Sequence, residues 1–221
     1  MGAETPTPYR HAVESPGHAD VTCKELDASP SQPAAGIGCL ALLPRRHSSG
    51  RLLATSLVSG RREIPLDVQE TVIDSGTSGI NAVVVTSRRL LGFSSRTFTW
   101  AKQDRDLNEK VLDRRMLPTF SVVRTDKNLY GFRGANGIWL DESLGVRESV
   151  KMTRTTDYGA VFVTNERLVG FASLLGDFSS IGLGIHEHVT RLDNENGLIL
   201  VTTSTRILVF GSRLSGWEEF Q

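Results

Sequence analysis

The sequence predicts an all-β protein assembled from tandem copies of one four-stranded unit. Aromatic residues recur every 39 positions, polar residues recur at the same interval, and the segments between them have the composition of strands. The phenylalanine register comprises Phe93, Phe132, Phe171 and Phe210. A second aromatic register comprises Trp100, Trp139, Phe178 and Trp217. One ring per unit at a fixed phase is what packing between units requires, so both registers are interpreted as structural.

Each element of the unit has its own signal. The runs 82–86 and 160–164 are β-branched and apolar, as expected for a strand buried on both faces. Two turn residues, such as those at 126 and 127, separate this strand from a Leu-x-Gly-Phe strand and predict a tight hairpin. A third strand is centred on the second aromatic register. Alternation over 66–72 and 183–189 predicts a fourth.

A unit of about 40 residues with four antiparallel strands resembles the blade of a β-propeller of WD40-like or tachylectin-like architecture. The Trp-Asp dipeptide of WD40 repeats and the Gly-Gly pair of kelch repeats are absent, so no specific family is identified. The resemblance implies a five-bladed ring, with four regular blades over 68–221 and a divergent one over 20–67. The ring would close by packing the first blade against the fifth. Residues 1–19, with three prolines, are expected to form a flexible tail.

Composition excludes several classes of partner. The chain of 221 residues carries 25 basic and 25 acidic side chains, so its net charge gives no long-range attraction to nucleic acid or an anionic membrane. It has no apolar run of the roughly 18 residues that a membrane helix needs, and no signal peptide. A soluble, cytoplasmic protein is predicted. Cys23 and Cys39 are interpreted as free thiols, with a single disulfide as the alternative.

A repeated carboxylate is the main candidate for catalysis. Glu70, Glu109, Glu148 and Glu187 share one register, and Arg89, Arg167 and Arg206 share another in which Asn128 takes the remaining place. A glycosidase needs two carboxylates in different environments, whereas repeated positions have similar ones, so structural ion pairs are favoured. His186 and His188 would lie on one strand face without a third ligand. No enzyme activity, metal or cofactor is predicted.

The departures from the repeat point to partner binding. Loops between first and second and between third and fourth strands vary and share one side, where a rigid scaffold builds specificity. The expected variable segments are 74–79, 114–118, 154–158 and 193–196 near the axis, and 96–98, 133–137, 174–177 and 213–216 farther out. The candidate residues are Arg61, Arg62, Arg114, Arg115, Arg154 and Tyr158, together with Arg45, Arg46 and His47 in an expanded hairpin of the first blade. This basic hairpin either contacts an acidic partner or pairs with Glu218 and Glu219 at ring closure.

These observations favour a non-enzymatic scaffold that recognises another protein through its variable loop side, as an accessory subunit of a larger complex. The alternatives are a carbohydrate-binding propeller with one shallow site per blade and, third, a five-bladed glycosidase that uses Glu109 and Glu148. Binding of nucleic acid and direct membrane insertion are not expected. The sequence does not predict an oligomeric state.

Overall fold

The computed structural model describes residues 21–23, 37–43, 50–56, 60–106, 108–211 and 216–220, and for the first two segments only the strand pairing. These residues form five four-stranded antiparallel sheets, each running through its strands in chain order, and no helix. The expected all-β fold with repeated four-stranded units is therefore confirmed. The predicted tail and the basic residues Arg45, Arg46 and His47 lie outside the described residues.

The first sheet contains β1 (Val21–Cys23), β2 (Ile37–Leu43), β3 (Arg51–Ser56) and β4 (Gly60–Pro65). The second contains β5 (Val72–Ser78), β6 (Asn81–Thr86), β7 (Arg89–Ser94) and β8 (Thr99–Asp104). The third contains β9 (Val111–Met116), β10 (Phe120–Thr125), β11 (Asn128–Arg133) and β12 (Ile138–Ser143). The fourth contains β13 (Val150–Thr155), β14 (Gly159–Thr164), β15 (Arg167–Ala172) and β16 (Asp177–Gly182). The fifth contains β17 (Val189–Glu195), β18 (Leu198–Thr203), β19 (Ile207–Gly211) and β20 (Trp217–Phe220).

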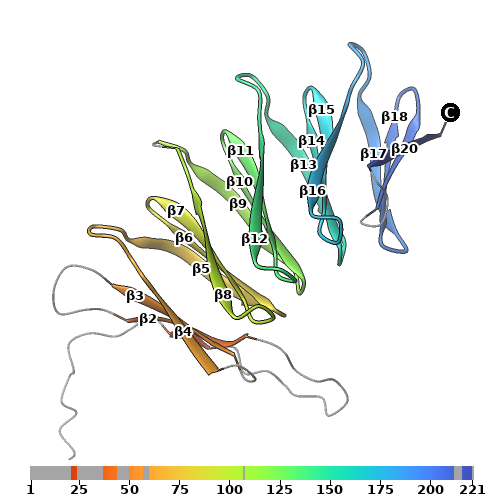
Figure 1. The fold of residues 1–221 in the computed structure, drawn as a ribbon. Coiled ribbons are helices and arrows are strands. Elements are labelled where there is room, and N and C mark those ends of the chain that lie inside the picture. Colours follow the sequence, from red (N-terminus) through yellow and green to blue (C-terminus); the bar gives the residue numbers. More distant parts are fainter. Residues whose placement is uncertain are drawn as a thin grey trace, which may run out of the picture.

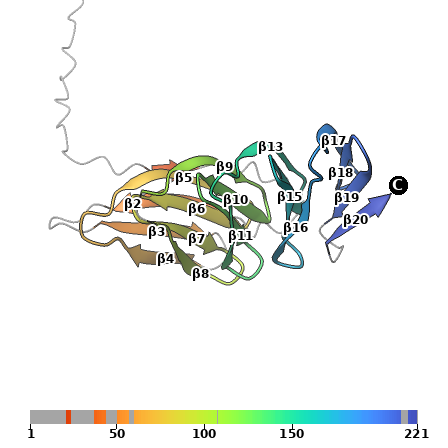
Figure 2. The same cartoon turned by 90° about the horizontal axis from the view of Figure 1, so that it is seen from above.

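The sheets stack face to face in chain order and form an open arc (Figure 1). The first and fifth sheets lie at opposite ends in both views (Figures 1 and 2). The described residues do not show the closed ring that the sequence predicts. Burial follows the same pattern, because every residue of β6 and β14 is buried, whereas β3 and β18 alternate between buried and exposed or partly exposed positions. Among the described residues, each end sheet is covered on one face only.

One predicted strand per unit is misplaced. The alternating segments at 66–72 and 183–189 are connections between sheets, in which the Glu187 amide donates to the Gly184 carbonyl at 2.9 Å and reverses the chain. The strand lies further on, over segments predicted as loops, so that Arg114 and Arg115 belong to β9 and Arg154 to β13. Period-two alternation misled because the apolar residues of these links alternate between buried or partly buried positions and exposed turn positions. In the first sheet, Cys23 and Cys39 are direct partners across β1 and β2.

Neighbouring sheets are held together by a glycine of one sheet and a phenylalanine of the next. A Cβ atom at Gly92, Gly131 or Gly170 would overlap the ring of Phe132, Phe171 or Phe210, respectively. These rings are at most 1% exposed. Each also packs against the aromatic residue opposite it on the fourth strand, with centroids 4.9 to 5.0 Å apart. The repeated glycine therefore marks the close approach of the next sheet, as expected for glycine inside a strand. We call this contact the Gly–Phe lock.

We expect Gly131→Ala to lower the free energy of unfolding by about 1–3 kcal/mol, because the added methyl group must displace the buried ring of Phe171. Gly182→Ala is the matched control, since Gly182 is also a strand residue but has no atom within 4 Å of an added Cβ. Urea titration of both variants measures the difference. Equal urea midpoints for the two variants would contradict the claim that the ring of Phe171 needs the space at Gly131.

Candidate protein-binding site

Turns at the two ends of the strands give the arc two distinct sides. The loop side carries the turns from first to second and from third to fourth strand of each sheet. The connection side carries the hairpins between second and third strands and the links from sheet to sheet. Both sides expose apolar side chains, in different arrangements.

On the loop side, the fourth sheet exposes three apolar side chains on two adjacent turns. Tyr158 is 44% exposed, Leu174 45% and Leu175 52%. Tyr158 precedes β14, and the two leucines lie between β15 and β16. The turns touch, because Ser173 donates to the Tyr158 carbonyl from its amide at 2.9 Å and from its hydroxyl at 2.6 Å. We call these three residues the loop patch.

The third sheet fixes the loop patch in position. Arg133 donates from Nε to the Ser173 carbonyl and from Nη2 to the Leu174 carbonyl, both at 2.7 Å. Gly176 has a φ of +70°, and a side chain there would meet the Arg133 guanidinium, so this turn requires glycine. Thr119 donates from Oγ1 to the Asp157 carbonyl at 2.9 Å. Hydrogen bonds from the third sheet therefore hold the backbone of both turns that carry the apolar side chains.

Three predicted candidate residues contribute to sheet packing or local pairing. Arg114 forms an ion pair with Asp74 of the second sheet at 2.9 Å, and its side chain is only 15% exposed. Arg154 donates to the Leu192 carbonyl of the fifth sheet at 3.1 Å. Arg115 pairs with Asp113 of its own strand at 3.2 Å. Arg114 and Arg154 thus tie neighbouring sheets together.

The remaining described candidates lie far from the loop patch. Arg61 and Arg62 are exposed residues of β4, in the first sheet, whereas Tyr158 belongs to the fourth (Figure 1). The Arg62 guanidinium carbon lies 5.7 Å from the ring centroid of Phe98 in the second sheet, at cation–π distance. The structure therefore does not bring the predicted residues into one site. Of that set, Tyr158 alone belongs to the loop patch.

Leu174 and Leu175 lie in the segment 174–177, which the sequence predicts to be a variable loop, but neither is among the predicted candidate residues. The corresponding turns of the second and third sheets read Ser-Arg-Thr-Phe at 95–98 and Gly-Ala-Asn-Gly at 134–137. The two leucines take the places of Arg-Thr in the second sheet and Ala-Asn in the third, which is a departure from the repeat. Their position beside Tyr158 follows from the sheet register and was not visible along the sequence.

The connection side exposes an aliphatic residue in three of the four links between sheets. Val68, Val146 and Ile185 share the 39-residue register, and Ile185 is 97% exposed. Singly exposed apolar residues are ordinary at protein surfaces, but these three occur at the same position of their links. We call them the aliphatic row. Val68 and Ile185 lie in the segments that the sequence predicts as strands.

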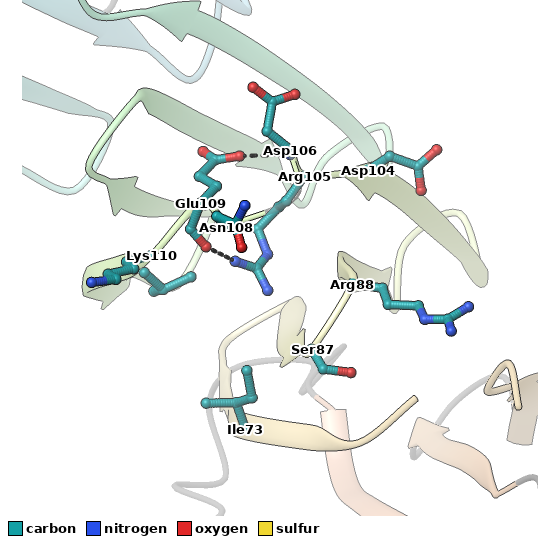
Figure 3. Close-up of a pocket in the computed structure, with 10 residues that line it drawn as sticks. Ile73, Ser87, Arg88, Asp104, Arg105, Asp106, Asn108, Glu109 and Lys110 are labelled. Carbon is teal, nitrogen blue, oxygen red and sulfur yellow. Dashed lines mark hydrogen bonds between the residues drawn. The ribbon is translucent and has the colours of Figure 1, made fainter. Parts of the chain in front are cut away.

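A pocket of about 840 Å³ opens on the connection side between the second and third sheets (Figure 3). Its lining mixes charges of both signs, including Arg88, Lys110, Asp104 and Asp106. Arg105 donates to the Glu109 carbonyl at 2.7 Å and to the Thr86 carbonyl at 2.5 Å. The guanidinium therefore ties the link that precedes β9 to the end of β6, and the lining offers no excess of one charge to an ionic ligand.

The repeated carboxylates form structural pairs, as expected from their phase. Three of them bind the arginine of their own sheet, with N–O distances of 2.8 Å for Glu70–Arg89, 2.9 Å for Glu148–Arg167 and 2.8 Å for Glu187–Arg206. In the third sheet Asn128 donates to Glu109 at 3.0 Å, and the Tyr130 hydroxyl donates to the same carboxylate. Burial raises the pKa of Tyr130, and the charge of Glu109 raises it further.

The electrostatics of the three arginine-bound carboxylates favour the ionised form. Hydrogen bonding from Arg206 lowers the pKa of Glu187 to about 2, against the opposing effect of burial. Burial raises the pKa of Glu70 and of Glu148, but hydrogen bonds from Arg89 and Arg167 outweigh it and leave both values below the usual one. A general acid needs a raised pKa instead. Within the described ranges, no group of three or more His, Cys, Asp or Glu residues could hold a metal, and no helix could span a membrane.

Repeated four-stranded antiparallel blades, each packed on the next, define the chain as a protein of β-propeller architecture. No family model matches the sequence, and no curated protein does. Among solved structures, the chain is similar to a fragment of HIRA, with 14% identity, a TM-score of 0.41 and coverage of 65% of this chain and 50% of that one.

Two further propellers show a comparable likeness. BamB from Moraxella catarrhalis has 13% identity and a TM-score of 0.34, covering 82% of this chain and 61% of that one. Kluyveromyces lactis Hsv2 has 12% identity and a TM-score of 0.34, covering 66% and 47%. The chain spans less than two thirds of the length of each of these three proteins. No specific family is identified.

Proposed function

We propose that this chain is a non-enzymatic scaffold that binds another protein through the loop patch. The observation that carries the proposal is the exposure of Tyr158, Leu174 and Leu175 on turns that Arg133 and Thr119 hold in place. Preorganised aromatic and aliphatic side chains lose little conformational freedom on binding, which is why such residues anchor protein interfaces. The patch lies on the side where the sequence predicts partner recognition.

The arginine-bound carboxylates support the non-enzymatic part of the proposal. A glycosidase mechanism through Glu109 and Glu148 needs one protonated and one ionised carboxyl group. Glu148 is held by Arg167 and has a lowered pKa, while Glu109 is satisfied by Asn128 and Tyr130. A carbohydrate-binding propeller with one site per blade would repeat its ligand-binding turns. The two leucines of the fourth sheet have no counterpart in the turns of the second and third sheets, which favours a single protein contact.

The test is co-purification of tagged full-length chain with and without the loop patch. We expect Leu174→Ser/Leu175→Ser to abolish capture of a partner protein while changing the free energy of unfolding by within about 1 kcal/mol, because both side chains are exposed. Val146→Ser/Ile185→Ser is the matched control, since it makes the same kind of change in the aliphatic row. Loss of the partner in the control, with retention in the loop-patch variant, would contradict the proposal and assign binding to the connection side.

A further inference from the structure

The outer faces of the two end sheets lack the residues of the Gly–Phe lock. The fifth sheet lacks the glycine, and the first sheet lacks the phenylalanine. On β19 of the fifth sheet, Val209 takes the position of Gly170, and on β3 of the first sheet Thr55 takes the position of Phe93. Both positions are partly exposed and face away from the rest of the arc, because their neighbours Phe210 and Ala54 are buried against the adjacent sheets. Val209 therefore fills the space that glycine leaves open in the inner sheets. Thr55 is smaller than the phenylalanine that fills that space. These two changes offset each other in volume when the faces meet.

The residues opposite these two positions are complementary in charge. Glu218 is the partner of Val209 across β19 and β20, and Arg61 is the partner of Thr55 across β3 and β4. Both side chains are exposed. In the contact between the fourth and fifth sheets, the corresponding pair Gly170 and Ser179 faces Phe210 and Trp217, and the Trp217 indole donates to the Ser179 carbonyl at 3.2 Å. The same geometry at the ends would place Glu218 opposite Arg61.

The outer face of the fifth sheet is apolar beyond this pair. Leu198 is 38% exposed, Ile207 43% and Phe220 52%. The residues at the equivalent places of the fourth sheet belong to the contact with the fifth: Leu168 is buried there and Ile181 packs against the same cluster. The fifth sheet therefore carries a face of the kind that the next sheet covers elsewhere in the arc. Nothing among the described residues covers it.

We propose that the outer face of the fifth sheet binds the outer face of the first sheet of a second copy of this chain, head to tail. Val209 packs beside Thr55 of the second copy, and Glu218 pairs with its Arg61. The chain's own first sheet does not cover the fifth sheet, because it lies at the far end of the arc (Figure 1). The buried Gly–Phe locks fix the orientation of the second to fifth sheets relative to one another. A second copy needs no internal rearrangement. Head-to-tail contacts of this type are heterologous. They form a closed ring of copies or an open filament, depending on the rotation between neighbouring copies.

Charge reversal at the contact tests the proposal by light scattering of the full-length chain at about 10 µM, in the range where stable assemblies form. Wild type is expected at a multiple of the 24.2 kDa chain mass. Arg61→Glu and Glu218→Arg are each expected to weaken assembly at least about tenfold, because like charges then meet. Their equimolar mixture is expected to assemble again, since every head-to-tail contact between unlike variants pairs opposite charges.

Arg96→Glu is the matched control, because Arg96 is an exposed arginine on the turn between β7 and β8, away from both end faces. This variant is expected to keep the wild-type mass. A wild-type mass of 24.2 kDa would overturn the proposal, whether the ends stay open or close within one chain. So would single variants that assemble like wild type, or a mixture that stays monomeric. Circular dichroism of each variant separates failure to assemble from failure to fold.

Discussion

Phe171→Ala is expected to lower the free energy of unfolding by about 3–5 kcal/mol, the usual cost of truncating a fully buried phenylalanine. The ring is 0% exposed and lies over Gly131 of the preceding sheet. It also packs against Phe120 and Phe178, with centroids 5.6 Å and 4.9 Å away. No neighbour can fill the space, because the glycine contributes no side chain.

Leu112→Ala serves as the control for Phe171→Ala. Leu112 is 56% exposed on β9, so its truncation is expected to change stability by within about 0.5 kcal/mol. Urea titrations compare the two variants. A cost for Phe171→Ala below about 1 kcal/mol would mean that the ring does not join the third and fourth sheets.

The second large effect is expected at the most buried ion pair. Glu70→Leu should cost about 3–5 kcal/mol, because it leaves the buried Arg89 guanidinium with only the exposed carboxylate of Asp67, 3.6 Å away. The two side chains are 0% and 8% exposed, and Arg89 also donates to the Pro65 carbonyl of the first sheet at 3.2 Å. The double change Glu70→Leu/Arg89→Met is expected to recover most of this loss, because no isolated charge remains.

Glu63→Leu provides the comparison for Glu70→Leu. Its partner Arg51 is 2.8 Å away, but the side chains are 41% and 32% exposed, so the pair is expected to contribute about 0–1 kcal/mol. Thermal or urea unfolding of all four chains, wild type included, measures these differences. If the double variant were as unstable as Glu70→Leu, the cost would come from lost packing and not from the unpaired charge.

The repeat made most of the sheet architecture predictable. Fixed spacing places the phenylalanines in equivalent environments, and the phase of Glu148 and Arg167 gives the ion pair that the structure contains at 2.9 Å. The repeated glycine lies where the neighbouring sheet comes close. These features depend on local pattern and on the equivalence of repeats, both of which are present in the sequence itself.

The features that were not predicted depend on distances between units. Arg114 looked like a free basic residue because Asp74, its partner, lies 40 positions away in the neighbouring sheet. Ring closure was expected because tandem blades bury their faces against each other, yet Thr55 and Val209 lack the contact that joins the inner sheets. The link around Ile185 was read as a strand because alternation alone does not distinguish a strand from a turn with exposed apolar residues.

Site-specific photo-crosslinking tests the proposed binding function most directly. A photoreactive residue at position 174, in the loop patch, is compared with one at position 146, in the aliphatic row, in the full-length chain under native conditions. Both positions are exposed, so neither replacement is expected to disturb the core. We expect a partner protein to be cross-linked from position 174 and not from position 146. Cross-linking from position 146 alone, or from neither position, would contradict it.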